Sequence, residues 1–421
     1  MIKGFNLKSE FVKYIVVLMS GTVMAQLVSY LLAPVISRIY VPEEAAELAI
    51  FIRVVSVGAA IATLRYEPAL PITKTDSHSF RLYQFALRST VIVTLASLVL
   101  ILVPAGMSSN ISSAVFYALI PIMILFSAIY NLGTNWSIRN KNFKSISFSK
   151  ITNSLFGGSF KVLFGWMNMG YVGLLLASTI GMLLSTVWFI RDFFTAKKKF
   201  QIRSNSPRSA VLARQYSEFP TINLPHVLMD LGRDLLVAVL LLKLFTKEDL
   251  GLYDHSYRML RIPLVFVGMA IGQVFFQHCA EKVNKNEDIV PLLRKSVGIL
   301  ALLSVIPFAV VFFYGEELFA FVFGENWRGA GTFSRIMAPW FLVNFIASPI
   351  STLPLILKKQ KVFFQLAITG TILMILTMTI PPLVYNASMF TTLWIVSLTQ
   401  ACYLVFVIFK KFEFARKHNA R

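Results

Sequence analysis

Runs of about twenty apolar residues recur along the whole chain, and each is long enough to cross a lipid bilayer as a helix. A helix rises 1.5 Å per residue, so about 20 residues span roughly 30 Å of hydrocarbon. Of the 421 residues, 56% are hydrophobic, above the roughly 45–50% of soluble domains. The sequence therefore predicts an all-α polytopic membrane protein with about twelve transmembrane helices. The predicted spans are 11–37, 46–72, 83–104, 113–133, 151–167, 171–190, 218–244, 250–279, 296–315, 331–357, 362–383 and 388–409.

The connections between these spans are short, at most about 30 residues, which leaves no room for a soluble catalytic domain. Whatever the protein does is therefore expected to happen within or at the bilayer. The apolar run after the basic opening segment is too long for the core of a signal peptide, so we expect the first helix to be retained. Cys279 and Cys402 lie at apolar helical positions, which favours packing over a disulfide framework.

The net charge of +20 is distributed unevenly over the two sides of the membrane. When alternate connections are assigned to opposite sides, most Lys and Arg fall on one side, and the other side holds only Arg38, Lys243, Lys247 and Arg328. The positive-inside rule then predicts that both termini and residues 191–216 are cytoplasmic and that residues 105–112 lie outside. The basic excess is explained by topology and anionic lipid headgroups, so no nucleic-acid partner is expected.

The longest basic connection divides the spans six plus six. It predicts an N-terminal six-helix bundle at 1–190, a cytoplasmic linker at 191–217 and a C-terminal bundle at 218–421. A shift of 205 positions lays 40–55 over 245–260 and Arg53 over Arg258. Such repeats are typical of secondary transporters with a substrate site where the repeats meet. We therefore expect two pseudo-symmetric bundles around a central cavity, and Pro220 and Pro225 after the linker are the best hinge candidates.

Charged side chains within the predicted spans are costly, about 2.5–3.5 kcal/mol each even on insertion scales, so they should face one another or water. The basic ones are Arg53, Arg65, Lys161, Arg233, Arg258, Arg261 and Arg335, and the acidic ones are Glu67, Asp230, Asp234 and Asp254.

Helical spacing predicts which of these charges can meet. Asp254, Arg258 and Arg261 share one face at i, i+4 and i+7, and Asp230, Arg233 and Asp234 are close enough to neutralise one another. Arg53 and Glu67 also share a face of a straight helix. Arg65 points away from that face, unless Pro68 distorts the helix enough to turn it inward.

Two interpretations stay open for each group. Arg53 and Arg258 either snorkel to outer headgroups or bind an anion such as phosphate in a shared cavity, with Arg261 as a second layer. Arg65 and Glu67 form either a structural or gating pair, or a substrate or proton site. The group of Asp230, Arg233 and Asp234 is either structural or involved in ion coupling, and Asp254 belongs with the gating candidates. Lys161 is either structural or, because its span is weakly apolar, lines water and belongs to the substrate-binding cations.

Signatures of enzyme chemistry are missing from the sequence. The five His residues show no metal-ligand spacing, and neither an HExxH motif nor a phosphate-cradling Gly-rich loop is present. We therefore expect a protein that is not an enzyme and that has no catalytic residues, metal or cofactor.

Three stretches resemble bacterial polysaccharide flippases of the multidrug/oligosaccharidyl-lipid/polysaccharide exporter superfamily. They are "LRYEPALPI" at 64–72, "NWSIRNKNFKSISFSKITNSL" at 135–155 and "EDLGLYDHSYRMLRIPLVFVGMAIGQVFFQHCAE" at 248–281. The resemblance implies a V-shaped pair of six-helix bundles in the bacterial inner membrane. It also implies a substrate, an undecaprenyl-pyrophosphate-linked oligosaccharide flipped for O-antigen (lipopolysaccharide), capsule or exopolysaccharide assembly. A polysaccharide polymerase and a chain-length regulator are candidate partners, besides membrane lipids.

Two rival classes of protein are weighed against the flippase. A multidrug or other cation antiporter of the same superfamily should have an acidic cavity, whereas basic residues here outnumber acidic ones seven to four within the spans. A membrane enzyme such as a polysaccharide polymerase should carry a large outside loop, and no long one is predicted.

Overall fold

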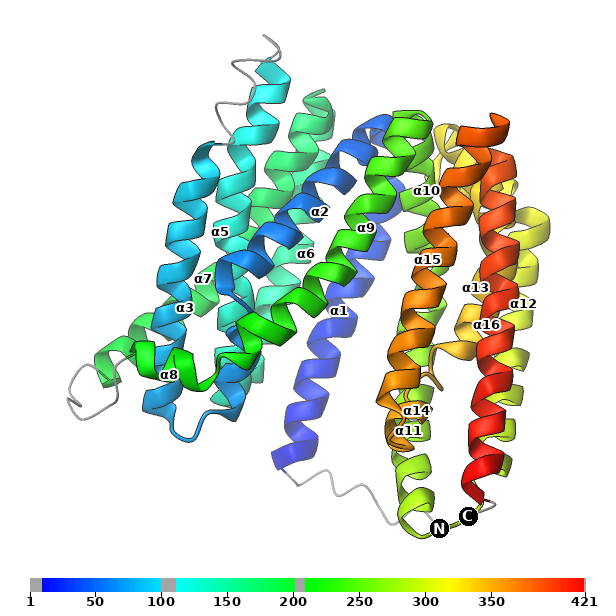
Figure 1. The fold of residues 1–421 in the computed structure, drawn as a ribbon. Helices are drawn as coiled ribbons and strands as arrows, with labels where there is room; N and C mark the ends of the chain where they lie inside the picture. Colours follow the sequence, from blue (N-terminus) through cyan, green and yellow to red (C-terminus); the bar gives the residue numbers. More distant parts are fainter. Residues whose placement is uncertain (1–9, 100–110, 201–208, 420–421) are drawn as a thin grey trace. The chain divides into compact units, whose positions relative to one another are not determined.

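The computed structural model describes residues 10–99, 111–200 and 209–419, and every regular element within these ranges is a helix. Each of the twelve predicted spans is occupied, in order, by one or more helices of these ranges (Figure 1). The end of the predicted third span at 100–104, the outside connection at 105–110 and linker residues 201–208 lie outside the described residues.

The first six spans are formed by long helices, the second of which is followed by a short 3-10 helix. In chain order these are α1 (Glu10–Ile39), α2 (Pro42–Thr63), the 3-10 helix η1 (Glu67–Ile72), α3 (Asp76–Ser97), α5 (Ile111–Arg139), α6 (Phe143–Trp166) and α7 (Gly170–Phe200).

The last six spans contain two π-helices, η3 and η4, at the seventh and eighth. The elements are η3 (Phe219–Asn223), α9 (Leu224–Leu244), α10 (Lys247–Leu260), η4 (Leu264–Gly268), α11 (Met269–Asn284), α12 (Val290–Phe323), η5 (Glu325–Trp327), α13 (Arg328–Ala347), α14 (Leu353–Ile356), α15 (Gln360–Tyr385) and α16 (Met389–Asn419).

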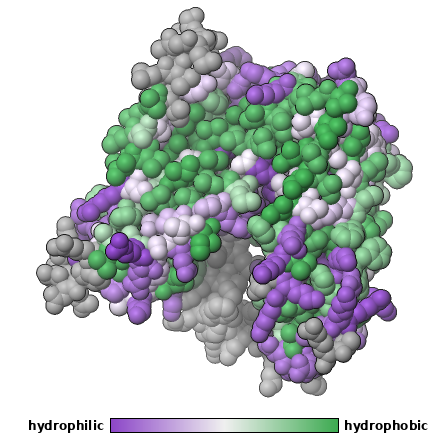
Figure 2. All heavy atoms as spheres, viewed as in Figure 1, coloured by the Kyte–Doolittle hydropathy of each residue, from purple (hydrophilic) through white to green (hydrophobic). Residues whose placement is uncertain are grey.

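Seven helices in the described part of the chain are long and apolar enough to cross a membrane: α1, α2, α5, α7, α12, α15 and α16. On α12, Leu302, Ile306, Phe313 and Phe321 are 70–80% exposed, as expected of side chains that face lipid. Figure 2 shows apolar residues over much of the visible surface, with hydrophilic residues gathered near helix ends. The helices of the remaining predicted spans are more polar or are interrupted, so length and hydropathy alone do not identify them as membrane-spanning.

The interruptions differ from the continuous helices that the sequence predicts. The predicted eighth span (250–279) breaks after Leu260, because Pro263 has no N–H to bond the preceding turn. The predicted tenth span (331–357) breaks between Ala347 and Leu353, where Pro349 and Pro354 have the same effect. Hydropathy reports where apolar residues lie and does not detect these breaks.

The predicted internal repeat is visible in the helix boundaries. Helix α2 begins at Pro42 and α10 at Lys247, which are 205 residues apart. In each, the carboxylate at the third helical position accepts a hydrogen bond from the residue before the helix, at 3.1 Å from Val41 to Glu44 and 3.1 Å from Thr246 to Asp249. Helices α7 and α16 both have 31 residues. The helix boundaries therefore carry the 205-residue repeat that the sequence predicts.

The described chain divides into two compact units, Met1–Leu236 and Val237–Arg421, so the division falls within α9. Parts of the predicted linker (191–217) are helical: α7 continues to Phe200, and α8 (Ser209–Gln215) packs against α3. The bundle boundaries at 190 and 217 stay a prediction.

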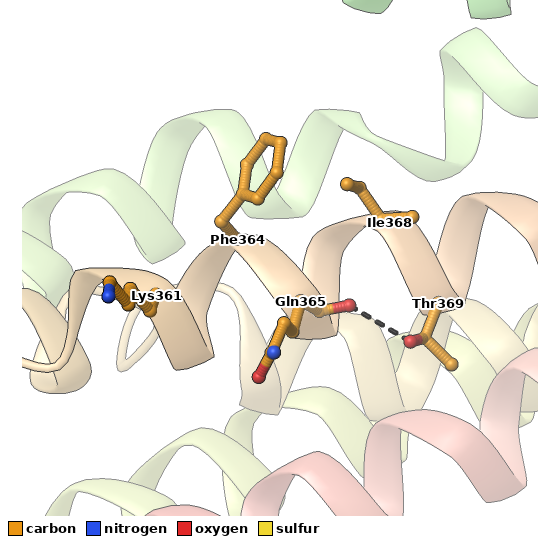
Figure 3. Close-up of a pocket in the computed structure, with 5 residues that line it drawn as sticks. All are labelled: Lys361, Phe364, Gln365, Ile368 and Thr369. Atoms are coloured by element: carbon orange, nitrogen blue, oxygen red, sulfur yellow. Dashed lines mark hydrogen bonds between the residues drawn. The ribbon is translucent and has the colours of Figure 1, made fainter.

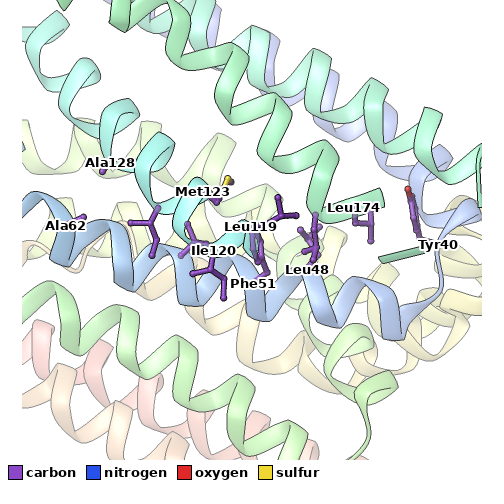
Figure 4. Packing of buried hydrophobic residues seen from close by; sticks show 12 residues of the cluster. Tyr40, Leu48, Phe51, Ala62, Leu119, Ile120, Met123, Ala128 and Leu174 are labelled. Carbon is purple, nitrogen blue, oxygen red and sulfur yellow. The ribbon is translucent and has the colours of Figure 1, made fainter. Parts of the chain in front are cut away.

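The N-terminal unit is held together by an apolar cluster between α2, α5 and α7 (Figure 4). Phe51 and Leu48 of α2 are buried against Leu119 and Met123 of α5 and Leu174 of α7. Burying such side chains stabilises a fold by about 1.5–3 kcal/mol each in water, and within a bilayer the gain comes from close packing. The cluster fixes α2 and thereby positions the charged segment that follows it.

Candidate functional site

The charged segment at the end of the second span is a break in the helix and not its continuation to residue 72. Helix α2 ends at Thr63, and Leu64 and Arg65 both adopt left-handed backbone angles, with φ of 50° and 54°. Pro68 lacks an N–H and restrains the residue before it, which disfavours an α-helix here. The Thr63 hydroxyl supports the break by accepting a hydrogen bond from the Arg65 N–H at 3.3 Å.

This break brings Arg65 and Glu67 together. Arg65 Nη1 lies 2.8 Å from Glu67 Oε1, and the Glu67 side chain is 1% exposed against 25% for Arg65. Arg65 Nε donates a second hydrogen bond to Asn223 Oδ1 of η3 at 3.2 Å. The straight-helix reasoning that placed Arg53 and Glu67 on one face is wrong, because the helix ends between them.

Glu67 keeps unused acceptor capacity. Its second oxygen, Oε2, is buried, and no described residue donates a hydrogen bond to it. A buried carboxylate oxygen without a donor is unfavourable, so this atom is suited to accept a hydrogen bond from a further donor. The roles predicted for Arg65 and Glu67 remain predictions.

Arg139 is a residue of this site that the sequence analysis missed. Its Nε donates to Asp76 Oδ1 at 3.0 Å, and its Nη1 donates to the carbonyls of Pro71 at 2.9 Å and Thr73 at 2.7 Å. Arg139 thereby fastens the end of η1 to α5. The available signal was the proline pair in "EPALPI", because a broken helix leaves carbonyls that need donors from elsewhere.

The charges of the seventh span lie on α9. Arg233 Nη2 pairs with the adjacent Asp234 at 3.2 Å, whereas Asp230 is exposed. The expected mutual neutralisation is therefore seen for Arg233 with Asp234 and not at the i, i+3 spacing of Asp230 with Arg233. Pro220 lies inside the π-helix η3 and Pro225 in the first turn of α9.

In the eighth span, Arg258 forms an ion pair with Asp254 one turn earlier on α10. Arg261 follows the last residue of the helix, and its guanidinium carbon lies 5.6 Å from the centre of the Tyr257 ring, a cation–π contact. Arg258 and Arg261 are both exposed. The two arginines differ in that Arg258 has a carboxylate partner and Arg261 contacts an aromatic face.

Three further intramembrane cations have different surroundings. Arg53 is half-buried and donates from Nη1 to the Ala49 carbonyl of its own helix at 3.0 Å. Lys161 is half-buried on α6, and Arg335 Nη1 lies 3.4 Å from Glu316 Oε1. Arg53 belongs to the N-terminal unit and Arg258 to the C-terminal unit, so the cavity that they were expected to share stays a prediction.

Lys411 is a second residue that the sequence analysis missed. Its side chain is 3% exposed, and Nζ donates to the carbonyl of Ala347 at 2.9 Å. Ala347 is the last residue of α13, so the ammonium caps that helix at its negative end. A lysine at the end of an apolar span gives no sequence signal of such burial.

A hollow of about 390 Å³ lies along the first half of α15. Figure 3 shows its lining of Lys361, Phe364, Gln365, Ile368 and Thr369, which mixes polar and apolar side chains from one helix. The Thr369 hydroxyl is satisfied by the Gln365 carbonyl at 2.9 Å.

Ion pairs outside the spans shift the pKa of surface carboxyls in the last turn of α11 and in the connection to α12. A hydrogen bond from Lys285 lowers the pKa of Glu281, and one from Lys282 lowers the pKa of Glu287. These carboxyls therefore stay ionised and offset the basic charge of this region. Within the described ranges, no three His, Cys, Asp or Glu residues gather as metal ligands would.

Residues 119–331, about half of the chain, match a protein family described as polysaccharide biosynthesis protein. The chain belongs to the polysaccharide biosynthesis protein family. No curated protein matches its sequence. The family match includes Lys161, Arg258 and Arg261 but not Arg65 and Glu67.

Solved structures show that this polysaccharide biosynthesis protein shares its fold with membrane transporters. A multidrug resistance MATE family transporter of the MOP superfamily, in an inward-facing conformation, matches with a TM-score of 0.67 and 13% identity, covering 96% of this chain and 98% of that one. The lipid II flippase MurJ, in an inward closed conformation, matches with a TM-score of 0.62 and 12% identity, covering 96% and 90%.

A MOP superfamily transporter from Pyrococcus furiosus Vc1 matches with a TM-score of 0.51 and 11% identity, covering 97% and 93%. Identities this low show the fold alone. The fold class predicted from the sequence, about twelve helices in two lobes, is confirmed, as is the resemblance at the level of family and fold.

Proposed function

We propose that this protein is a flippase that moves an undecaprenyl-pyrophosphate-linked oligosaccharide from the inner to the outer leaflet of the bacterial cytoplasmic membrane by alternating access. The family match carries the proposal, because it places a multi-pass protein with a transporter fold in polysaccharide biosynthesis. The flipped unit would supply O-antigen, capsule or exopolysaccharide, and both termini would be cytoplasmic. The polymerase and chain-length regulator of that process are the proposed partners.

The substrate's pyrophosphate explains why cations are needed within the spans. Phosphate groups lose much of their hydration in a low-dielectric layer, and guanidinium groups can replace it with paired hydrogen bonds. Arg261 is the best-placed candidate in the C-terminal unit, because its guanidinium carbon lies over the Tyr257 ring, 5.6 Å from the ring centre, and an aromatic face attracts a cation without supplying a negative charge. Arg53, Arg65, Arg258 and Lys161 remain candidates.

Alternating access also needs helices that can bend. The second, eighth and tenth spans are interrupted near prolines, and the seventh begins with a π-helix. Such irregular turns are typical positions of hinges in transport proteins.

The alternative function is a multidrug or other cation antiporter, which the match to a MATE family transporter favours. A cation site needs carboxylates that are free to bind cargo. Here three of the four acids predicted within spans already pair with arginine: Glu67 with Arg65, Asp234 with Arg233 and Asp254 with Arg258. This pairing leaves an excess of positive charge and supports an anionic substrate.

Complementation tests the proposal directly. The gene is expressed in a panel of hosts that each lack their own polysaccharide flippase, and surface polysaccharide is measured per amount of folded protein in the membrane. Restored polysaccharide in one host supports the flippase. Absence of polysaccharide in every host, with drug efflux conferred on a sensitive strain, would favour the antiporter.

A further inference from the structure

One guanidinium joins two segments that are distant in the sequence. Arg65 Nε donates to Asn223 Oδ1, 158 residues further along the chain, and Arg65 Nη1 donates to Glu67 Oε1. Asn223 is the last residue of the π-helix that leads into α9. The side chains therefore link the break of the second span to the beginning of the seventh.

Both linked segments have backbone conformations that need support from their surroundings. Leu64 and Arg65 occupy the left-handed region, which is unfavourable for side chains other than Gly. In η3, the Leu224 N–H bonds to the Phe219 carbonyl, five residues back. π-Helical turns are rare and concentrate at functional sites. Each segment could relax to a more ordinary conformation if its contacts were lost.

Packing brings the same two segments together. The Tyr66 hydroxyl donates to the Ala213 carbonyl of α8 at 3.0 Å. Phe219 packs against the buried cluster that contains Tyr66, Leu70 and Phe80. The two segments are therefore joined by apolar packing at Phe219 and by a hydrogen bond from Arg65 to Asn223.

The ion pair with Glu67 keeps the Arg65 side chain in its position beside Asn223. The Glu67 side chain is almost fully buried, and Arg65 is its ion-pair partner. Arg139 of α5 is another cation on an element that packs against η1. Among the described residues, its hydrogen bonds go to Asp76 and to the carbonyls of Pro71 and Thr73, and not to Glu67. Removing one partner from a buried ion pair is strongly unfavourable, so the pair with Glu67 holds Arg65 in place.

We propose that Asn223 is a positioning residue which, with Arg65 and Glu67, forms a latch between the second span and the π-helix of the seventh. The latch is closed in this structure and opens when the ion pair between Arg65 and Glu67 breaks, which frees the start of α9 to change conformation. The contacts of the latch do not depend on the proposed function. Its role in transport rests on that function, because movement of α9 would be a step of alternating access.

Hydrogen exchange of the purified full-length protein, without substrate, tests the latch. Asn223→Leu removes the acceptor for Arg65, and we expect amide exchange in residues 219–224 to rise about tenfold or more. Glu67→Gln should raise exchange in the same segment. Asn223→Asp keeps an oxygen acceptor and should retain the protection.

Thr221→Val is the matched control, since the Thr221 hydroxyl bonds to the Ser217 carbonyl one turn earlier and to no other described residue. If Asn223→Leu does not accumulate, Arg65→Lys removes the Nε donor and allows the same comparison. Exchange in Asn223→Leu no faster than in Thr221→Val, or unchanged exchange in Glu67→Gln, would overturn the latch. Because no substrate is used, this result does not depend on whether the protein is a flippase.

Discussion

Arg53 and Arg258 show at the residue scale how the same residue type can have different surroundings at equivalent positions. Each lies eleven residues after the start of its helix, α2 or α10. Arg258 pairs with Asp254, and Arg53 bonds to the carbonyl of Ala49. Their shared position was predictable from the 205-residue shift. Their partners were not, because several side chains lie within reach on one helical face and only the packed structure selects among them.

Replacement by Lys and by Ala distinguishes substrate binding from snorkelling for this pair. If Arg53 and Arg258 contact pyrophosphate, Lys variants keep the charge but lose bidentate geometry, and export should fall about tenfold. Ala variants should fail. The measurement is surface polysaccharide in the host that the protein complements, normalised to folded protein.

The matched control for this pair is Arg328→Ala, since Arg328 is the first residue of α13, lies outside the predicted spans and pairs with Glu325 at 2.6 Å. Its export should stay near normal. Normal export from the Arg53→Ala, Arg258→Ala double variant would show that both side chains only snorkel to headgroups.

At the scale of elements, the apolar runs predicted where the twelve spans lie, but not where three of them break. A break depends on distant groups that satisfy the freed backbone, such as Arg139 for Pro71 and Thr73 or Lys411 for Ala347. These partners lie 64 or more residues away in sequence. Periodicity within one segment contains no information about them.

Helix packing in the N-terminal unit depends on a close approach of α6 and α7. A Cβ atom on Gly181 would lie 2.7 Å from the Cα of Gly157. Because that neighbour is backbone, Gly181→Ala must push the helices apart, which should lower the free energy of unfolding by about 1–3 kcal/mol. Thermal unfolding of the purified protein should show a lower Tm.

Gly232→Ala provides the control, because no atom lies within 4 Å of the Cβ position there. Alanine has the higher helix propensity by about 1 kcal/mol, so this variant should be unchanged or slightly more stable. Equal melting temperatures for the two alanine variants would contradict the close packing of α6 with α7.

At the scale of the whole molecule, charge distribution and the repeat act together. A six-plus-six repeat with both termini on one side requires an even number of spans, and the bias of Lys and Arg indicates which side is cytoplasmic. The fold shared with MOP superfamily transporters agrees with the number of spans. The predicted orientation in the membrane depends on this charge bias alone, and a labelling experiment tests it.

Cysteine labelling of intact cells measures this orientation. In a background where Cys279 and Cys402 are replaced, Ser108→Cys lies in a connection without basic residues and Lys198→Cys in the exposed basic end of α7. The positive-inside rule predicts that a membrane-impermeant maleimide labels position 108 in intact cells and position 198 only after lysis. Labelling of position 108 only after lysis would invert the topology. The substrate-loading side of the proposed flippase would then face outward, so this experiment also tests the direction of transport.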